Sequence, residues 1–291
     1  MLRSLAPIAR YSYGGQYCCR LKALAVAKQQ LHRTLVTQLS PTTSLLRAEE
    51  SDNEVYLIGT AHVSEKSGKE VSDLIELVQP KTVFIELDPP RAARLIHENQ
   101  DKFEEQFHQA AASLTKNLPA QILGPNERLL GDYIRGFYKM LKKYGLVPGV
   151  DMLSGIHAGT RIGATLYYGD RDANDTLREL TATLSPAALL RGMATPVPTE
   201  IEKTFQEAMS GGLETLGDSV EQIKTREYAY QMSDWISRAF PETAEVLIHK
   251  RDLHMARNLR KHCSKGQVVA VVGMAHMDGI EREWTALGKK E

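Results

Sequence analysis

The chain has 291 residues, with 36 Lys and Arg against 36 Asp and Glu, so its formal net charge is zero. This balance gives no reason to expect a nucleic acid as a partner, and no apolar run is long enough for a transmembrane helix, although peripheral membrane association stays open. With 42% hydrophobic and 25% charged residues, the composition is that of an ordinary globular protein with a substantial core.

The first 48 residues differ from the rest in charge. They contain seven basic residues and no acidic one, since the first carboxylate is Glu49. Basic segments with Arg and Ser but without acidic residues are typical of organelle transit peptides. We therefore expect residues 1–48 to be a transit peptide, mitochondrial in preference to plastid, or otherwise a disordered basic leader. Residues 49–291 are then the folded domain.

Strand and helix patterns alternate along this domain. Residues 55–58 form a short apolar run, 67–78 carry apolar residues at helical spacing, and 82–87 are rich in β-branched and aromatic residues. Strand, helix and strand in this order predict a βαβ unit with parallel strands. Further apolar runs at 164–168 and 267–272 predict two more strands.

Helical patterns separate and follow these strands. The stretch 184–217 contains several Pro and Gly residues and is expected to form short helices and loops, as a lid or insertion. Longer helical patterns cover residues 91–144, 150–163, 221–236 and 242–262. The predicted fold class is therefore α/β, with a mainly parallel central sheet flanked by helices and a helical insertion.

Two strands are followed by the same short motif. Gly59 to His62 and Gly273 to His276 both read Gly-x-Ala-His after an apolar run. The glycine allows the backbone to turn sharply as the strand leaves the sheet. Each histidine is thereby expected just beyond the carboxyl end of its strand, where parallel sheets bind ligands.

Charged residues follow the other two strands. They are Glu86, Asp88, Arg91, Asp170, Arg171 and Asp172. Taken singly, a carboxylate at such a position can be a helix cap. Together they predict a shared polar site, because charges beside apolar strands are costly unless neighbouring groups satisfy them. We expect this site to contain His62, Glu86, Arg171 and His276.

These segments resemble the TraB/PrgY/GumN family. The matching text lies, in order, at 58–64, 83–91, 149–178, 251–256 and 271–280, and the resemblance extends over residues 54–285. It implies a fold like those of Tiki, erythromycin esterase and ChaN. It also implies that the paired Gly-x-x-His motifs and Glu86 occupy the positions used by Tiki-type metalloproteases.

The leading hypothesis is metal-assisted hydrolysis of a peptide or related acyl bond. His62, Glu86 and His276 are the candidate ligands of a divalent ion such as Mn, Co or Zn. A bound metal would acidify water and polarise the scissile carbonyl. Glu86 is alternatively the general base.

Two further sets of charged residues would serve the reaction. One binds a substrate carboxylate or stabilises the oxyanion, and the other orients the reacting groups through hydrogen bonds. The first set is Arg91, Arg171 and Arg251, and the second is Asp88, Asp172 and Asp252, while Asp170 is expected both to bind substrate and to orient the reacting groups.

Three alternatives stay open. A His–Glu pair can activate water without a metal, and chelation would distinguish the two versions. The domain could instead be a non-enzymatic tethering or ligand-sensing module at the mitochondrial membrane. Haem ligation by a histidine is the third alternative, less favoured than a metal, and a Soret band would detect it.

Overall fold

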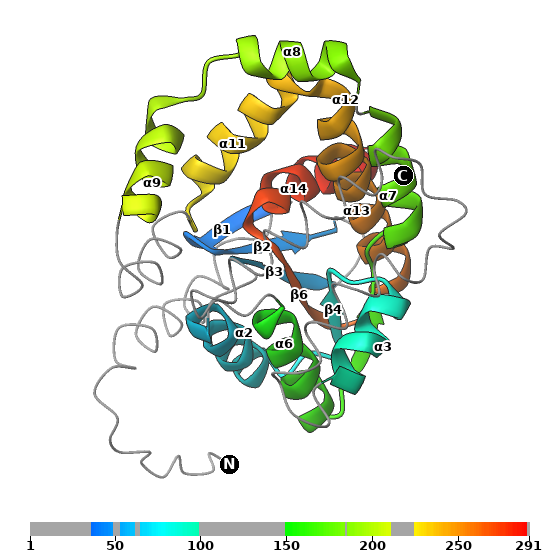
Figure 1. The fold of residues 1–291 in the computed structure, drawn as a ribbon. Helices are drawn as coiled ribbons and strands as arrows, with labels where there is room; N and C mark the ends of the chain where they lie inside the picture. Colours follow the sequence, from blue (N-terminus) through cyan, green and yellow to red (C-terminus); the bar gives the residue numbers. More distant parts are fainter. Residues whose placement is uncertain are drawn as a thin grey trace, which may run out of the picture. The chain divides into compact units, whose positions relative to one another are not determined.

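A six-stranded sheet with the order β1-β2-β3-β6-β4-β5 forms the centre of the fold (Figure 1). The computed structural model describes residues 36–48, 53–61, 65–98, 149–183, 185–210 and 224–289. The strands are β1 (Val36–Ser40), β2 (Thr43–Arg47), β3 (Glu54–Thr60), β4 (Thr82–Ile85), β5 (Thr165–Tyr168) and β6 (Gln267–Gly273).

The sheet is mixed. β3, β6, β4 and β5 run parallel to one another, as the strand–helix alternation predicts. β1 and β2 form an antiparallel hairpin that extends the sheet beyond β3. The α/β class is therefore confirmed, with the parallel arrangement restricted to four of the six strands.

The sheet begins upstream of the boundary expected at residue 49. Val36–Ser40 and Thr43–Arg47 lie within the stretch expected to be a leader, yet both are strands. The physical reason is burial: Leu45 and Leu46 are 2% and 0% exposed, because they pack into the core beside β3. The rest of the expected leader, residues 1–35, lies outside the described residues.

Helices cover both faces of the sheet (Figure 1). They are α2 (Glu65–Val78), α3 (Pro89–Glu98), α6 (Val150–Arg161), α7 (Ala173–Thr183), α8 (Pro186–Ala194), α9 (Thr199–Ser210), α11 (Arg226–Ala239), α12 (Pro241–Ala244), the π-helical turn η1 (Glu245–His249), α13 (Lys250–His262) and α14 (Met274–Gly288). α2 and α6 pack together on one face, while α11, α13 and α14 cover the other.

Alternation of side chains along each strand divides the core between these layers. Val55 and Leu57 of β3 face α13 and α14 and form one cluster with Met255 and Trp284. The intervening positions face the other layer, where Val271 lies against Gly155 of α6. β3, β4 and β6 are therefore buried on both faces, which is why they read as continuous apolar runs.

The expected helices correspond to real ones with shifted ends. The pattern over 242–262 is a helical run of α12, η1 and α13, and the pattern over 221–236 begins at Arg226. The insertion at 184–217 contains α8 and α9, and its last part lies outside the described residues. The same is true of most of the pattern at 91–144, of which α3 is described.

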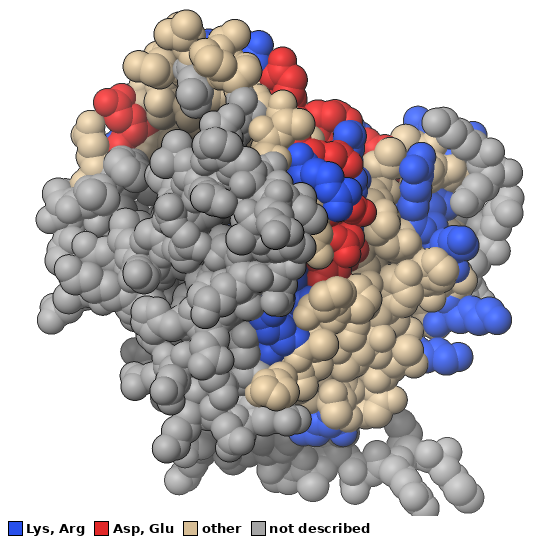
Figure 2. Space-filling model, turned by 45° about the vertical axis from the view of Figure 1, so that its right-hand side comes forward, with Lys and Arg blue, Asp and Glu red and all other residues tan. Residues whose placement is uncertain are grey.

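The surface mixes both signs of charge. Acidic and basic side chains lie side by side in the central band of the face drawn in Figure 2, as expected for a chain with balanced charges. Within the described ranges, no helix combines the length and apolar character that crossing a bilayer requires.

Candidate functional site

Glu86 occupies the carboxyl edge of the parallel strands. β4 ends at Ile85, and the backbone N–H of Glu86 still donates to the carbonyl of Val271 on β6 (3.0 Å). The buried carboxylate then reaches over the end of β6, where Oε2 accepts from the backbone N–H of Gly273 (2.6 Å). This bond connects Glu86 to the end of β6, and His276 lies in the first turn of the helix that follows β6.

Arg251 lies at the centre of the polar cluster and follows the π-helical turn η1, a distortion that often marks functional sites. Its Nε and Nη2 donate to the two oxygens of Asp170 (3.0 and 2.8 Å), and Nη2 also donates to Oε1 of Glu86. Although burial opposes its charge, Glu86 and Asp170 raise the pKa of Arg251 above its already high usual value. The guanidinium is therefore a permanent buried cation between two carboxylates.

His276 is held at both ring nitrogens. Nδ1 lies 2.6 Å from Oδ1 of Asp252, and Nε2 lies 2.9 Å from Nη1 of Arg251. A guanidinium can only donate, so Nε2 accepts and the proton of a neutral ring belongs on Nδ1. Nε2 is also 3.3 Å from Oε1 of Glu86. The ring therefore presents its basic nitrogen to the Glu86–Arg251 pair.

Asp252 can reach His276 because Gly279 has no side chain. A Cβ at Gly279 would lie 1.7 Å from Oδ2 of Asp252. Burial raises the pKa of Asp252, while the hydrogen bond from His276 and the charge of Arg282 oppose this rise. Helix α14 thus carries His276, leaves room for Asp252 at Gly279, and places the positive charge of Arg282 near Asp252.

Arg91 connects two of the strand ends. Its Nη2 donates to Asp170 (2.5 Å) and its Nε to Asp88 (3.2 Å). Asp88 also accepts from the backbone N–H groups of Arg91 (2.7 Å) and Ala173 (2.6 Å), which begin α3 and α7. Despite burial, the guanidinium groups of Arg251 and Arg91 hold the pKa of Asp170 well below its usual range. Arg91, expected to bind substrate, is therefore engaged with carboxylates of the chain itself.

Arg171 lies apart from this cluster. Only its backbone N–H contacts Asp170 (2.8 Å); its Nη2 pairs with Glu179 (2.7 Å), which also binds Lys250 (2.8 Å). Its expected place beside Glu86 and His276 is therefore taken by Arg251, because Glu179 on α7 draws Arg171 away. Asp172 accepts from the backbone N–H of Asn174 (2.8 Å) and caps α7.

The described candidates for metal binding fit a guanidinium better than a metal. Glu86 and His276 lie together, but Arg251 donates to both of the facing atoms, Oε1 and Nε2. A divalent ion would need these lone pairs and would be repelled by the cation. His62 lies outside the described residues, and within the described ranges no group of three potential ligands is arranged around a common point.

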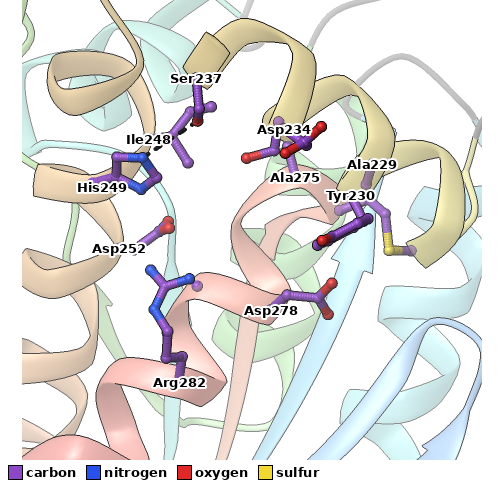
Figure 3. Close-up of a pocket in the computed structure, with 13 residues that line it drawn as sticks. Ala229, Tyr230, Asp234, Ser237, Ile248, His249, Asp252, Ala275, Asp278 and Arg282 are labelled. Carbon is purple, nitrogen blue, oxygen red and sulfur yellow. Dashed lines mark hydrogen bonds between the residues drawn. The ribbon is translucent and has the colours of Figure 1, made fainter. Parts of the chain in front are cut away.

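A cavity of about 180 Å³ adjoins Asp252 between α11, η1 and α14 (Figure 3). It was not expected from the sequence, because polar residues at helical spacing on α11 and α14 resemble an ordinary solvated helix face. Its polar lining includes Tyr230, Asp234, His249, Asp252, Asp278 and Arg282. Asp252 therefore both contacts His276 and lines this cavity.

Fold and site together define an α/β domain of the class that builds a polar site at the carboxyl edge of parallel strands. The model of the TraB/PrgY/gumN family matches residues 44–291, so the chain belongs to this family.

Curated relatives agree with this assignment. The chain is 29% identical to an uncharacterized protein of Methanocaldococcus jannaschii, over 79% of this chain and 53% of that protein. It is 24% identical to the human TraB domain-containing protein and 25% identical to the bovine one, in each case over 84% of this chain and 66% of the relative. The chain therefore spans about half to two thirds of the length of these relatives.

Proposed function

We propose that this chain is a hydrolase that cleaves a peptide or related acyl bond, with His276 as the general base. The observation that carries the proposal is the position of His276. Asp252 fixes the proton on Nδ1, and Nε2 faces Glu86 and Arg251 at the edge of the sheet. A base, a carboxylate that orients it and a nearby cation are the parts that water-mediated acyl cleavage needs.

The chemistry follows from these contacts. A water molecule that displaces Arg251 from Nε2 would give its proton to His276, and its oxygen would attack the acyl carbon. The negative charge on the carbonyl oxygen would be stabilised by the guanidinium of Arg251, which Asp170 holds from the other side. His276 would then return the proton to the leaving amine or alkoxide as the acyl bond breaks.

Metal assistance is a separate proposal for the same residues. It requires Arg251 to withdraw, so that His62, Glu86 and His276 can surround the ion. Activity that disappears on exhaustive chelation and returns with Mn²⁺, Co²⁺ or Zn²⁺ would support the metal-assisted version. Activity that survives chelation would support His276 acting with the chain's own charges.

The test of the hydrolase itself is a panel of fluorogenic peptides and activated esters. His276→Ala should abolish turnover, and Asp252→Asn should reduce kcat/KM by about 10³–10⁴-fold, as loss of the orienting carboxylate does in other triads. His157→Ala removes an exposed histidine of α6 and should leave activity unchanged. If the folded wild-type protein cleaves none of these peptides and esters, the proposal is wrong.

One observation favours the non-enzymatic alternative. The polar cluster is closed: His276 is 5% exposed, and both of its ring nitrogens already have partners in the chain. In that case the cluster is a structural core of a ligand-sensing or tethering module. His276→Ala would then lower stability, while the wild-type protein would cleave nothing.

A further inference from the structure

The cavity beside Asp252 has a lining that is unusually mixed in charge. Asp234 of α11, Asp252 of α13 and Asp278 of α14 face it, and Arg282 extends from α14 toward Asp252 (Figure 3). Its apolar wall includes Ile248. A pocket with a few polar groups of both signs on an apolar wall has the character of a small-molecule site.

Two of these three carboxylates already have cationic partners. Asp234 pairs with Arg238 (2.9 Å), and Asp278 pairs with Arg226 (2.6 Å). Both pairs are partly exposed, and a carboxylate can accept several donors, so each keeps capacity for a further cation.

Arg282 differs from these groups. Its Nε contacts Glu283 at 3.3 Å, and within the described ranges its two Nη nitrogens have no hydrogen-bond partner. Its side chain is 57% exposed. The guanidinium fork that faces the cavity is therefore available to a carboxylate that arrives from solution.

We infer that this cavity binds a small zwitterion carrying both a carboxylate and an ammonium group, of which a free α-amino acid is the simplest. Arg282 receives the carboxylate, and the acidic wall receives the ammonium. A ligand with a carboxylate alone would face three carboxylates at close range. A ligand with an ammonium alone would leave the guanidinium of Arg282 without a partner.

Size restricts the ligand further. A cavity of about 150 Å³ holds a benzene ring. The volume of about 180 Å³ here therefore suits an amino acid with a medium apolar side chain, such as leucine. Tyr230, which is 61% exposed and lines the cavity, provides an aromatic surface for that side chain.

The site would communicate with His276 through one residue. Oδ1 of Asp252 holds the imidazole, while the same carboxylate lines the cavity. A ligand bound against Asp252 would change the charge felt by His276. Binding itself does not depend on the proposed hydrolase activity, so the two can fail separately.

The experiment is calorimetric titration of the full chain with leucine, with 4-methylpentanoate, which lacks the ammonium, and with 3-methylbutylamine, which lacks the carboxylate. Leucine should bind saturably, and each half should bind at least tenfold more weakly. Arg282→Gln should weaken leucine binding at least tenfold. Arg178→Gln removes an exposed guanidinium from α7, which does not line the cavity, and should change nothing.

A second variant keeps the test valid if Arg282→Gln fails to fold. Ser233→Trp fills the cavity from α11 without removing a charge, and should also abolish binding. Ring signals of His249 and His276 in the NMR spectrum should move on addition of leucine to the wild type. No binding of leucine, unchanged binding in both variants, or equally tight binding of 4-methylpentanoate would overturn the inference.

Discussion

Replacement of Arg251 by methionine should destabilise the fold more than any other single change in the polar cluster. Arg251 is the cation that Glu86 and Asp170 share, and both carboxylates are almost fully buried. Methionine preserves much of the side-chain volume and removes the charge. In the variant, each of the two buried carboxylates therefore has fewer hydrogen-bond donors.

The size of the stability loss depends on the hydrogen-bond donors that the two carboxylates keep in the variant. Removing one partner of a buried ion pair costs about 3–5 kcal/mol. Asp170 keeps Arg91, and Glu86 keeps the backbone N–H of Gly273, so the loss should lie near the lower end, about 3 kcal/mol. With a urea slope of about 3 kcal/mol per molar, the unfolding midpoint should fall by about 1 M.

The dependence on pH gives a second measurement. The pKa of Asp170 is lowered in the folded state, so its ionisation stabilises the fold above the unfolded pKa of about 3.9 and this contribution is lost as pH falls through the folded pKa. Without Arg251 the pKa of Asp170 is lowered less. The difference between wild type and variant should therefore be largest above about pH 4 and shrink below it.

The assay is urea unfolding followed by circular dichroism at pH 7 and at low pH. Arg171→Met is the matched control, because the partner of Arg171 is the hydrated Glu179 and its loss should move the midpoint little. Equal decreases in the urea midpoint for the two variants would refute the central position of Arg251. A decrease in stability for Arg251→Met that does not change with pH would also refute it.

Three further outcomes are expected. Gly279→Ala should displace Asp252, because the new Cβ would lie 1.7 Å from Oδ2, and the chemical shifts of the His276 ring that Asp252 contacts should change. Burial raises the pKa of the Cys263 thiol to about 12, so peptide mapping after iodoacetamide treatment at pH 8 should find it unmodified until the protein unfolds. Residues 1–35 fused to a fluorescent protein should direct it to mitochondria; a diffuse signal would contradict the transit-peptide prediction.

The central parallel strands could be predicted from the sequence because β3, β4 and β6 are buried on both faces. An apolar run such as 267–272, which is closed by Gly273, identifies such a strand without knowledge of its partners. The hairpin of β1 and β2 could not be predicted. Its strands are short and partly polar, and only β2 pairs with β3, while β1 pairs with β2.

The site could be predicted in outline. The carboxyl-edge rule predicts Glu86, Asp170 and His276 at one edge of the sheet, and in the structure Arg251 contacts all three. Which arginine joins them depends on helix packing that strand patterns do not encode. Arg251 enters from α13, while Arg171, closer in sequence to Asp170, turns toward Glu179.

The hairpin of β1 and β2 has a practical consequence for anyone who expresses this protein. β2 pairs with β3 from Arg47 against Glu54 to Thr43 against Ile58. A polypeptide that starts at residue 49 would leave this row of backbone donors and acceptors unpaired beside an apolar surface, the arrangement that invites sheet-to-sheet aggregation. Soluble preparations should therefore start at or before Val36, and insolubility of shorter versions would say nothing about whether the fold needs a ligand.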